Sequence, residues 1–304
     1  MQLIRGLKNL TTHTGSVVTI GNFDGVHIGH QKIIDKLVTK SKLLNLPSVL
    51  ISFVPTPQSF FGKEQATLSS FQEKHELLSQ SGLDEHLIIR FNQNFSQLSA
   101  KTFIEKILVD QLNIKYCLIG DDFRFGKNRQ GDFKFLYDYG KKYNFSVEDT
   151  PSVMQNNERI SSSKIRSMLQ QGKLDQAQHM LGRAFSISGK IVHGQKKGRT
   201  IGFPTINIPI KRKVSPVLGV FAVTVTIQNT AHQGVCNIGK RPTVNGHNTL
   251  LEVFIFNFDQ QVYGQSAQVT FMKKIRDEKK FDSFDQLKQQ IDQDVLDAKA
   301  YFKG

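Results

Sequence analysis

His27 and His30 lie three positions apart in the segment GNFDGVHIGHQ. Their imidazole N–H groups can donate hydrogen bonds to phosphate oxygens and stabilise negative charge that develops on a reacting phosphate. The glycines of the segment let the backbone approach such a group closely. The sequence therefore predicts a phosphate-binding site here. Its further expected members are Gly21, Asn22, Asp24, Gly25 and Gly29.

Two histidines at this spacing also have simpler explanations, a surface turn or a zinc-binding pair. Zinc needs at least one more strong ligand, and none is evident near by in the sequence. The apolar run Ser16–Ile20 predicts a strand before the segment, and His30–Leu44 predicts a helix after it. A helix start presents free N–H groups and a positive dipole end to an anion. This position favours the phosphates of a nucleotide.

The segment ISSSKIR, which ends at Arg166, is a second candidate. Ser162 and Ser163 stand at an expected helix start, where simple N-capping is the alternative role. The cations Lys164 and Arg166 beside free N–H groups suit a triphosphate. We therefore expect Ser162, Ser163 and Arg166 to bind nucleotide.

A third candidate, IGDDFRFG, follows an expected strand and contains Asp121 and Asp122. Either carboxylate could bind a ribose or a metal ion, with ordinary surface carboxylates as the alternative.

The segment HGQKKGRTIGFPTINIP interleaves glycines with cations. Such a flap suits the phosphates of a nucleotide, and a mobile basic hairpin without a ligand is the alternative. Its expected phosphate-binding residues are Gly194, Lys196, Gly198 and Arg199.

Thr205 and Asn207 are two apart on an expected strand, so they point the same way and offer oxygens to Mg²⁺. Glu252 lies inside the apolar run LLEVFIFNF. A carboxylate in such a strand is unfavourable unless it is used or paired. It could accept a proton from an attacking hydroxyl, with a structural salt bridge as the alternative.

The elements that position these residues follow two patterns. In the first half, strands alternate with helices, which predicts a parallel sheet of an α/β domain with ligands beyond the carboxyl ends of its strands. The expected strands are Ser16–Ile20, Ser48–Phe53, His86–Phe91 and Tyr116–Ile119. The expected helices are His30–Leu44, Phe71–Gln80, Ala100–Leu112 and Asp132–Tyr143, then the short Ser162–Gln171 and Leu174–Leu181.

From Phe185 to Lys274 the chain shows short β-runs with turn residues, which predicts a small antiparallel barrel. The stretch Ser283–Phe302 has apolar residues at helical spacing, so we expect a terminal helix on that barrel. We place the domain boundary near Gly182, giving domains 1–182 and 183–304.

The chain has 304 residues, 40 Lys and Arg against 26 Asp and Glu, and a formal net charge of +14. The positive electrostatic field of such a chain attracts nucleic acid, acidic membrane surfaces or phosphorylated small molecules. There is no dense Lys/Arg tract that would indicate a nucleic-acid arm, so we expect no nucleic-acid partner.

Cys117 and Cys236 lie in apolar runs and are too few for a disulfide framework, so we expect both to be buried and reduced. The start MQLIRGLKNL lacks the apolar core of a signal peptide, and no run of ~18 apolar residues could span a membrane. We expect a cytoplasmic protein without a membrane partner, either monomeric or weakly self-associating.

The HIGH tetrapeptide and ISSSKIR resemble the two signatures of the nucleotidyltransferase superfamily. With GDDFRFGKNRQGD, they are similar to the adenylyltransferase half of the bacterial bifunctional riboflavin kinase/FMN adenylyltransferase (FAD synthetase) family. The resemblance implies a Rossmann-like domain that transfers AMP from ATP to FMN and releases pyrophosphate. It implies that His27, His30, Ser162, Ser163 and Arg166 contact the ATP phosphates.

The second half resembles the riboflavin kinase module of the same family in GRTIGFPTIN, GVCNIGKRPTV and LEVFIFNF. The resemblance implies that Thr205 and Asn207 hold Mg²⁺ and ATP, and that Glu252 activates the riboflavin 5′-hydroxyl for attack on the γ-phosphate. Riboflavin, FMN and ATP are thus the expected partners. The expected flavin-binding residues are Arg276, Phe60 and Phe61.

The chain departs from the family pattern in a few places. The usual Phe-x-Pro-His-Pro segment reads Phe53-Val54-Pro55-Thr56-Pro57, which lacks the histidine and an acid often found at x. Ser163 replaces a threonine, Lys164 an arginine and Phe254 a histidine. We therefore expect adenylylation to be the weaker activity.

Three alternatives stay open. One is a riboflavin kinase with weak or lost adenylyltransferase activity, and another is a basic RNA- or flavin-binding module without turnover. The HIGH tetrapeptide also occurs in aminoacyl-tRNA synthetases, but no tRNA-binding extension or Lys-Met-Ser-Lys-Ser type loop is present.

Overall fold

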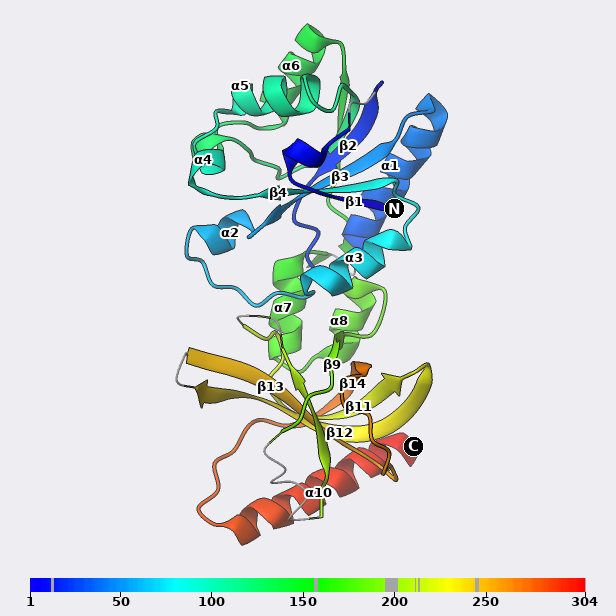
Figure 1. Ribbon diagram of the computed structural model, residues 1–304, viewed down its shortest axis with the longest axis vertical. Helices are drawn as coiled ribbons and strands as arrows, with labels where there is room; N and C mark the ends of the chain where they lie inside the picture. Colours follow the sequence, from blue (N-terminus) through cyan, green and yellow to red (C-terminus); the bar gives the residue numbers. More distant parts are fainter. Residues whose placement is uncertain are drawn as a thin grey trace. The chain divides into compact units, whose positions relative to one another are not determined.

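A computed structural model describes residues 1–11, 14–155, 158–194, 202–210, 212, 214–243 and 246–303. The chain forms two compact units (Figure 1). The N-terminal unit comprises Met1–Gln65 and Phe71–Ser161, and the C-terminal unit comprises Ala66–Ser70 and Ser162–Gly304. The expected boundary at residue 182 stays a prediction.

The N-terminal unit is built on one parallel sheet of six strands, as the alternation of strands and helices predicted. In hydrogen-bonding order they are β1 (Gln2–Arg5), β4 (Glu85–Arg90), β3 (Ser48–Val54), β2 (Ser16–Ile20), β5 (Ile114–Gly120) and β6 (Ser146–Thr150). A short hairpin pairs β7 (Met154–Gln155) with β8 (Glu158–Arg159).

Helices cover both faces of this sheet. They are α1 (Ile28–Leu44), α2 (Pro57–Phe60), α3 (Phe71–Ser79), α4 (Gln93–Ser96), α5 (Ala100–Thr102) and α6 (Phe133–Tyr143), with 3₁₀ turns η1 (Leu7–Asn9) and η3 (Lys127–Arg129) and a π-helical stretch η2 (Phe103–Val109). Neighbouring strand residues face opposite sides, so Val17 shares a core with Ile34 and Leu37 of α1. Val18 shares the other core with Ile104 and Leu108 of η2. Both faces are therefore buried, as a parallel sheet requires.

The strand order creates a switch point between β2 and β5. From β2 the chain adds β3 and β4 on one side, whereas β5 and β6 lie on the other. Ligands of such sheets bind in the crevice beyond the carboxyl ends of the strands at this point. Gly21 follows β2 and Asp121 follows β5, so two predicted segments flank the switch point.

The C-terminal unit contains the predicted antiparallel barrel and terminal helix. Its sheet runs in the order β10 (Thr205–Pro209), β13 (Gly246–Ile255), β12 (Thr230–Thr243), β11 (Gly219–Ile227), β14 (Ser266–Arg276) and β9 (Ser186–Lys190). A bridge between Val192, after β9, and Asn207 on β10 nearly closes the barrel.

The described part of the C-terminal unit also contains the helices α7 (Ser162–Gln170), α8 (Leu174–Leu181) and α10 (Phe284–Lys303). In Figure 1, α10 lies along the barrel. Val295 and Ala298 of α10 form a core with Val220 and Ala222 of β11. The face of the sheet that carries these two strand residues is therefore covered by a helix.

Two further observations concern membranes and thiols. No helix in the described ranges is long and apolar enough to cross a bilayer.

Cys117 and Cys236 are free and buried, as expected. Burial raises the pKa of the Cys117 thiol to about 12 and that of Cys236 further, so both thiols are unreactive.

Candidate functional site

His27 and His30 form a stacked pair at the start of α1. His27 is the N-cap, and its Nδ1 accepts a hydrogen bond from the backbone N–H of His30 at 3.3 Å. The two rings lie with their centroids 3.6 Å apart and their planes 15° apart. A Cβ at Gly29 would lie 3.2 Å from the His27 ring, so a larger residue there would press on the pair. The pair sits where the helix end favours an anion.

His30 is neutral at pH 7 in this environment. Its pKa lies well below the usual value, first because of burial, then because of the nearby His27 and the Lys74 ammonium. The Phe23 ring packs against it with centroids 4.8 Å apart. Its Nδ1 is buried and has no hydrogen-bond partner among the described residues. A neutral imidazole can donate a hydrogen bond to a phosphate while keeping a fixed orientation.

The loop that leads into α1 is held in a strained backbone shape. Phe23 has φ 49° and Val26 has φ 39°, in the left-handed region that such side chains avoid, and Gly25 has φ 80°. Both side chains are buried in the core, which keeps them there. Strain of this kind persists where the surrounding structure enforces it, typically at functional sites.

Lys74 of α3 reaches this loop, although the sequence interpretation did not include it. Its side chain is buried, with a relative exposure of 7%, and its Nζ donates to the Asn22 carbonyl oxygen at 3.0 Å. The sequence spacing could have indicated its burial, because Lys74 lies four positions before the buried Leu78 and so shares the apolar face of the helix.

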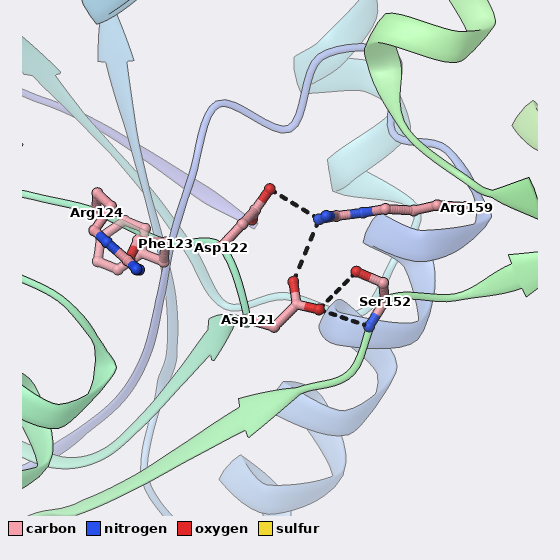
Figure 2. A network of polar contacts seen from close by, with 6 residues as sticks. All are labelled: Asp121, Asp122, Phe123, Arg124, Ser152 and Arg159. Carbon is pink, nitrogen blue, oxygen red and sulfur yellow. Dashed lines mark hydrogen bonds and ion pairs between the residues drawn. The ribbon is translucent and has the colours of Figure 1, made fainter.

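Asp121 and Asp122 belong to a network with Arg159, which the interpretation also missed. Figure 2 shows the Arg159 guanidinium between the two carboxylates, 3.3 Å from Asp121 and 2.8 Å from Asp122. Ser152 donates to Asp121 from its hydroxyl at 2.7 Å and from its backbone N–H at 3.2 Å. These bonds, with Arg159, lower the pKa of Asp121. Binding of a ribose or a metal ion by the two aspartates stays a prediction.

Phe60 and Phe61 lie in an aromatic cluster beyond β3. The Phe60 ring contacts Phe91 edge-on at 5.3 Å, and Phe91 contacts Phe53 and Phe95 in the same manner. Phe61 is 65% exposed. Phe53 and Phe91 stand at the carboxyl ends of β3 and β4, so the cluster lies at the sheet edge that carries the histidines. A planar ligand could stack there.

The ISSSKIR segment places its polar residues on α7 of the C-terminal unit. Arg166 Nη1 lies 3.5 Å from the Ser163 hydroxyl, one turn away, and α7 begins at Ser162. Their joint action with the histidines on one triphosphate stays a prediction.

The barrel register brings the predicted kinase residues into one row. Asn207 on β10 pairs with Glu252 on β13, which pairs with Asn237 on β12. Asn237 pairs with Val220, and Val220 pairs with Arg276 on β14. Directly opposed residues of antiparallel strands have side chains on the same face, ~5 Å apart at Cβ. Glu252 therefore lies between two amide side chains, of which Asn237 was not predicted.

Thr205 and Asn207 share a face of β10, as their spacing predicted. Asn207 is buried, and Gly194 packs directly against it. A Cβ at position 194 would overlap the Asn207 amide, so this contact requires glycine. The other flap residues, Lys196, Gly198 and Arg199, lie outside the described residues.

Arg276 is held by α10. Its Nε and Nη2 donate to the two carboxylate oxygens of Asp294 at 2.8 and 2.6 Å. Asp294 is 3% exposed and also accepts from Gln290 at 3.1 Å. The guanidinium lies over the Phe281 ring at 5.7 Å. Contact of Arg276 with a flavin stays a prediction.

The described residues combine a parallel sheet, with a helix start at its switch point, and an antiparallel barrel with a row of side-chain oxygens, an arrangement that suits a transferase acting on nucleotides. Two family models match the chain in this order, FAD synthetase over residues 9–164 and riboflavin kinase over residues 181–302. The chain belongs to the bifunctional riboflavin kinase/FMN adenylyltransferase family.

Named relatives align with the chain from end to end. The bifunctional riboflavin kinase/FMN adenylyltransferase of Haemophilus influenzae is 46% identical over 308 residues and covers 100% of both chains. That of Escherichia coli strain K12 is 44% identical, covering 99% of this chain and 98% of its own. A crystal structure described as a macrolide-efflux protein from Streptococcus pneumoniae has a TM-score of 0.82 at 31% identity and covers 97% of both chains. Both units thus have counterparts in single proteins.

Proposed function

We propose that this chain converts riboflavin to FAD in two ATP-dependent steps, one in each unit. The C-terminal unit phosphorylates riboflavin to FMN, and the N-terminal unit adenylylates FMN to FAD. The observation that carries this proposal is the end-to-end match to relatives with both activities in their name. A histidine-capped helix start in one unit and a row of side-chain oxygens in the other support it.

In the C-terminal unit, Glu252 takes the proton of the riboflavin 5′-hydroxyl. The oxygen then attacks the γ-phosphorus of ATP, the bond to the bridging oxygen breaks, and ADP leaves. Asn207 and Asn237, on either side of Glu252 in the strand pairing, can orient its carboxylate or the substrate hydroxyl by hydrogen bonds. The buried position of Asn207 supports a fixed geometry.

The donor set of this row fits a hard cation. Thr205 offers a hydroxyl oxygen and Asn207 an amide oxygen, and Mg²⁺ prefers oxygen ligands. Gly194 leaves room for the Asn207 amide, which a side chain would displace. The described residues include no group of three or more His, Cys, Asp or Glu that could hold a metal ion by themselves, so phosphate oxygens would complete the coordination. When bound, Mg²⁺ would neutralise phosphate charge.

In the N-terminal unit, a phosphate oxygen of FMN attacks the α-phosphorus of ATP. The bond from that phosphorus to the oxygen bridging the β-phosphate breaks, and pyrophosphate leaves without a covalent enzyme intermediate. The stacked histidines and the start of α1 stabilise the charge that develops on the α-phosphate. Phe60 and Phe61 are the proposed surface for the flavin ring.

We place this enzyme in the cytoplasm as a monomer or weakly associating species, with small molecules and no nucleic acid as its partners. Two free, buried thiols in a chain with no other cysteine support a reducing compartment.

Incubation of the full chain with riboflavin, ATP and Mg²⁺, followed by chromatography, tests the proposal. FMN should appear before FAD because it is the substrate of the second step. It should also accumulate, because the segment Val54–Pro57 lacks the family's histidine and adenylylation is expected to be slower. FMN alone would restrict the function to the kinase. Neither product, with flavin or RNA still bound, would indicate a binding module.

A further inference from the structure

Lys74 is a buried cation beneath the loop that carries the two histidines. A buried ammonium group loses its hydration and is retained only where it is paired and hydrogen-bonded. Here the Nζ atom donates to the Asn22 carbonyl oxygen at 3.0 Å. Burial lowers the pKa of Lys74, and the Asp24 carboxylate of the same loop opposes that change. The lysine is thus bound to this loop by both a hydrogen bond and a charge.

The hydrogen bond falls at the point where the loop departs from ordinary geometry. The Asn22 carbonyl belongs to the peptide bond before Phe23, whose φ is 49°. The Phe23 ring in turn packs on His30. A direct chain of contacts therefore runs from Lys74 through this peptide to the catalytic histidine pair.

The ammonium also acts on the surrounding imidazoles by charge. After burial, His27 and Lys74 lower the pKa of His30. Burial likewise lowers the pKa of His86 to about 3, with Lys74 and His75 contributing. The Lys74 charge therefore favours the neutral form of both His30, at the start of α1, and His86 on β4.

We propose that Lys74 is a positioning residue of the adenylyl-transfer site: its ammonium holds the Asn22 carbonyl and thereby fixes the loop that presents His27 and His30 to ATP. This inference rests on the proposed function of the N-terminal unit. The lysine acts through the loop and the histidines, since it is buried beneath them.

Three substitutions separate the hydrogen bond from the charge. Lys74→Arg keeps both, Lys74→Gln keeps an N–H donor without the charge, and Lys74→Met removes both. Lys106→Met, at an exposed lysine of the same unit, is the matched control. For each full-length variant, kcat and KM for FMN adenylylation are measured, with riboflavin phosphorylation in the same sample as the second readout.

We expect Lys74→Met to lower kcat for adenylylation by about 10- to 100-fold with KM for FMN within about 2-fold, because a small displacement of catalytic groups slows chemistry more than binding. The kcat of Lys74→Gln for adenylylation should lie between that of Lys74→Met and that of the wild type. Lys74→Arg should retain most of the wild-type rate. Phosphorylation should not change in any variant, and Lys106→Met should leave both activities unchanged.

A titration of His30 by NMR reports the effect of the Lys74 charge separately from that of its hydrogen bond. In Lys74→Gln the pKa of His30 should rise relative to wild type, because one nearby positive charge is gone while burial and His27 remain.

Adenylylation within about 2-fold of wild type in both Lys74→Met and Lys74→Gln would overturn the inference. An arginine variant as slow as the methionine variant would overturn it as well. If Lys74→Met does not fold, the adenylylation rates of Lys74→Gln and Lys74→Arg are compared with that of the wild type by the same criteria. A wild-type chain that makes no FAD would contradict the proposed function instead.

Discussion

His30 and Glu252 obtain their properties from different neighbours. Burial, His27 and Lys74 keep His30 neutral, so it can offer a hydrogen bond to a polyanion in a fixed orientation. Glu252 instead lies on a half-buried strand position with Asn207 and Asn237 opposite it. His30 is therefore suited to stabilising charge in the N-terminal unit, and Glu252 to accepting a proton in the C-terminal unit.

Glu252→Gln should lower FMN formation by about 10²- to 10⁴-fold, because an amide cannot take the hydroxyl proton. Conversion of added FMN to FAD should stay unchanged. Both rates are measured by chromatography, with Asp259→Asn, an exposed carboxylate of the same unit, as the control. Equal loss of both activities would contradict two separate sites.

His30→Ala should show the reverse pattern. Loss of a preorganised donor at the α-phosphate lowers adenylylation by about 10²-fold or more, whereas riboflavin phosphorylation continues at the wild-type rate. His179→Ala, at an exposed histidine on α8, serves as the control. An unchanged rate of FAD formation would remove His30 from the site.

At the scale of elements, α1 is placed by its own apolar side chains and by its first residues. Ile34 and Leu37 pack in the sheet core, which directs the N-terminal end of the helix to the switch point. α10 is placed similarly, by Val295 and Ala298 together with the Asp294 carboxylate. Packing therefore sets where each helix end lies, and the polar residues act from there.

The pairing of β3 with β4 should make the N-terminal unit sensitive to acid. His86 on β4 is fully buried and exchanges a hydrogen bond of 2.7 Å with the Ser52 hydroxyl on β3. Its folded pKa is about 3, whereas an unfolded histidine has a pKa of ~6.5. Between these values the unfolded chain binds the proton and the folded chain does not, so stability should fall as pH falls, by at most ~1.4 kcal/mol per pH unit.

Urea denaturation followed by tyrosine fluorescence between pH 7 and pH 4 measures this effect, because most tyrosines lie in the N-terminal unit. His86→Gln, which can keep a polar partner for Ser52 but does not titrate, should give a shallower pH dependence. An identical slope in the two proteins would assign the acid sensitivity to other groups.

The contact between α10 and β14 supports a second prediction. Asp294→Ala should destabilise the C-terminal unit by about 3 kcal/mol, because it leaves the largely buried Arg276 without its bidentate partner. Asp297→Ala, one turn later and exposed, should change stability by less than ~0.5 kcal/mol. Urea denaturation of the two variants provides the comparison, and equal effects would contradict the role of the pair.

Periodicity predicted most elements but not the sheet edges. β2 and α8 have the bounds that apolar patterning indicated. The sequence did not predict β1, because only Ile4 of its four residues is buried. It did not predict β6 either, because the side chains of that strand are mostly polar. The expected helix Ala100–Leu112 begins as expected but becomes π-helical and ends at Val109. Edge strands bury little, so their sequences carry little pattern.

The candidate sites were predictable only where one segment carries them. His27 and His30 stand in a single motif, whereas Lys74 meets Asn22 across 52 positions and Arg159 meets Asp121 across 38. The row of Asn207, Glu252 and Asn237 depends on strand register, which sequence spacing does not reveal. Site residues that meet only through tertiary contacts therefore could not be predicted from the sequence.

For the whole molecule, the two units have separate cores, and the histidine pair lies in one unit whereas Glu252 lies in the other. An equimolar mixture of Glu252→Gln and His30→Ala chains should therefore make FAD from riboflavin, which neither variant makes alone at a comparable rate. FMN released by the second variant would be adenylylated by the first. Chromatography of the mixture tests this, and a mixture that stops at FMN would show that the two sites must act within one chain.

The burial of both native thiols has a practical consequence. Cys117 and Cys236 are shielded in the two cores and hold their protons. Maleimide dyes would therefore attach to cysteines engineered on the surface, one in each unit, without prior removal of the native pair. Energy transfer between such dyes would report the separation of the units in solution while each nucleotide is added.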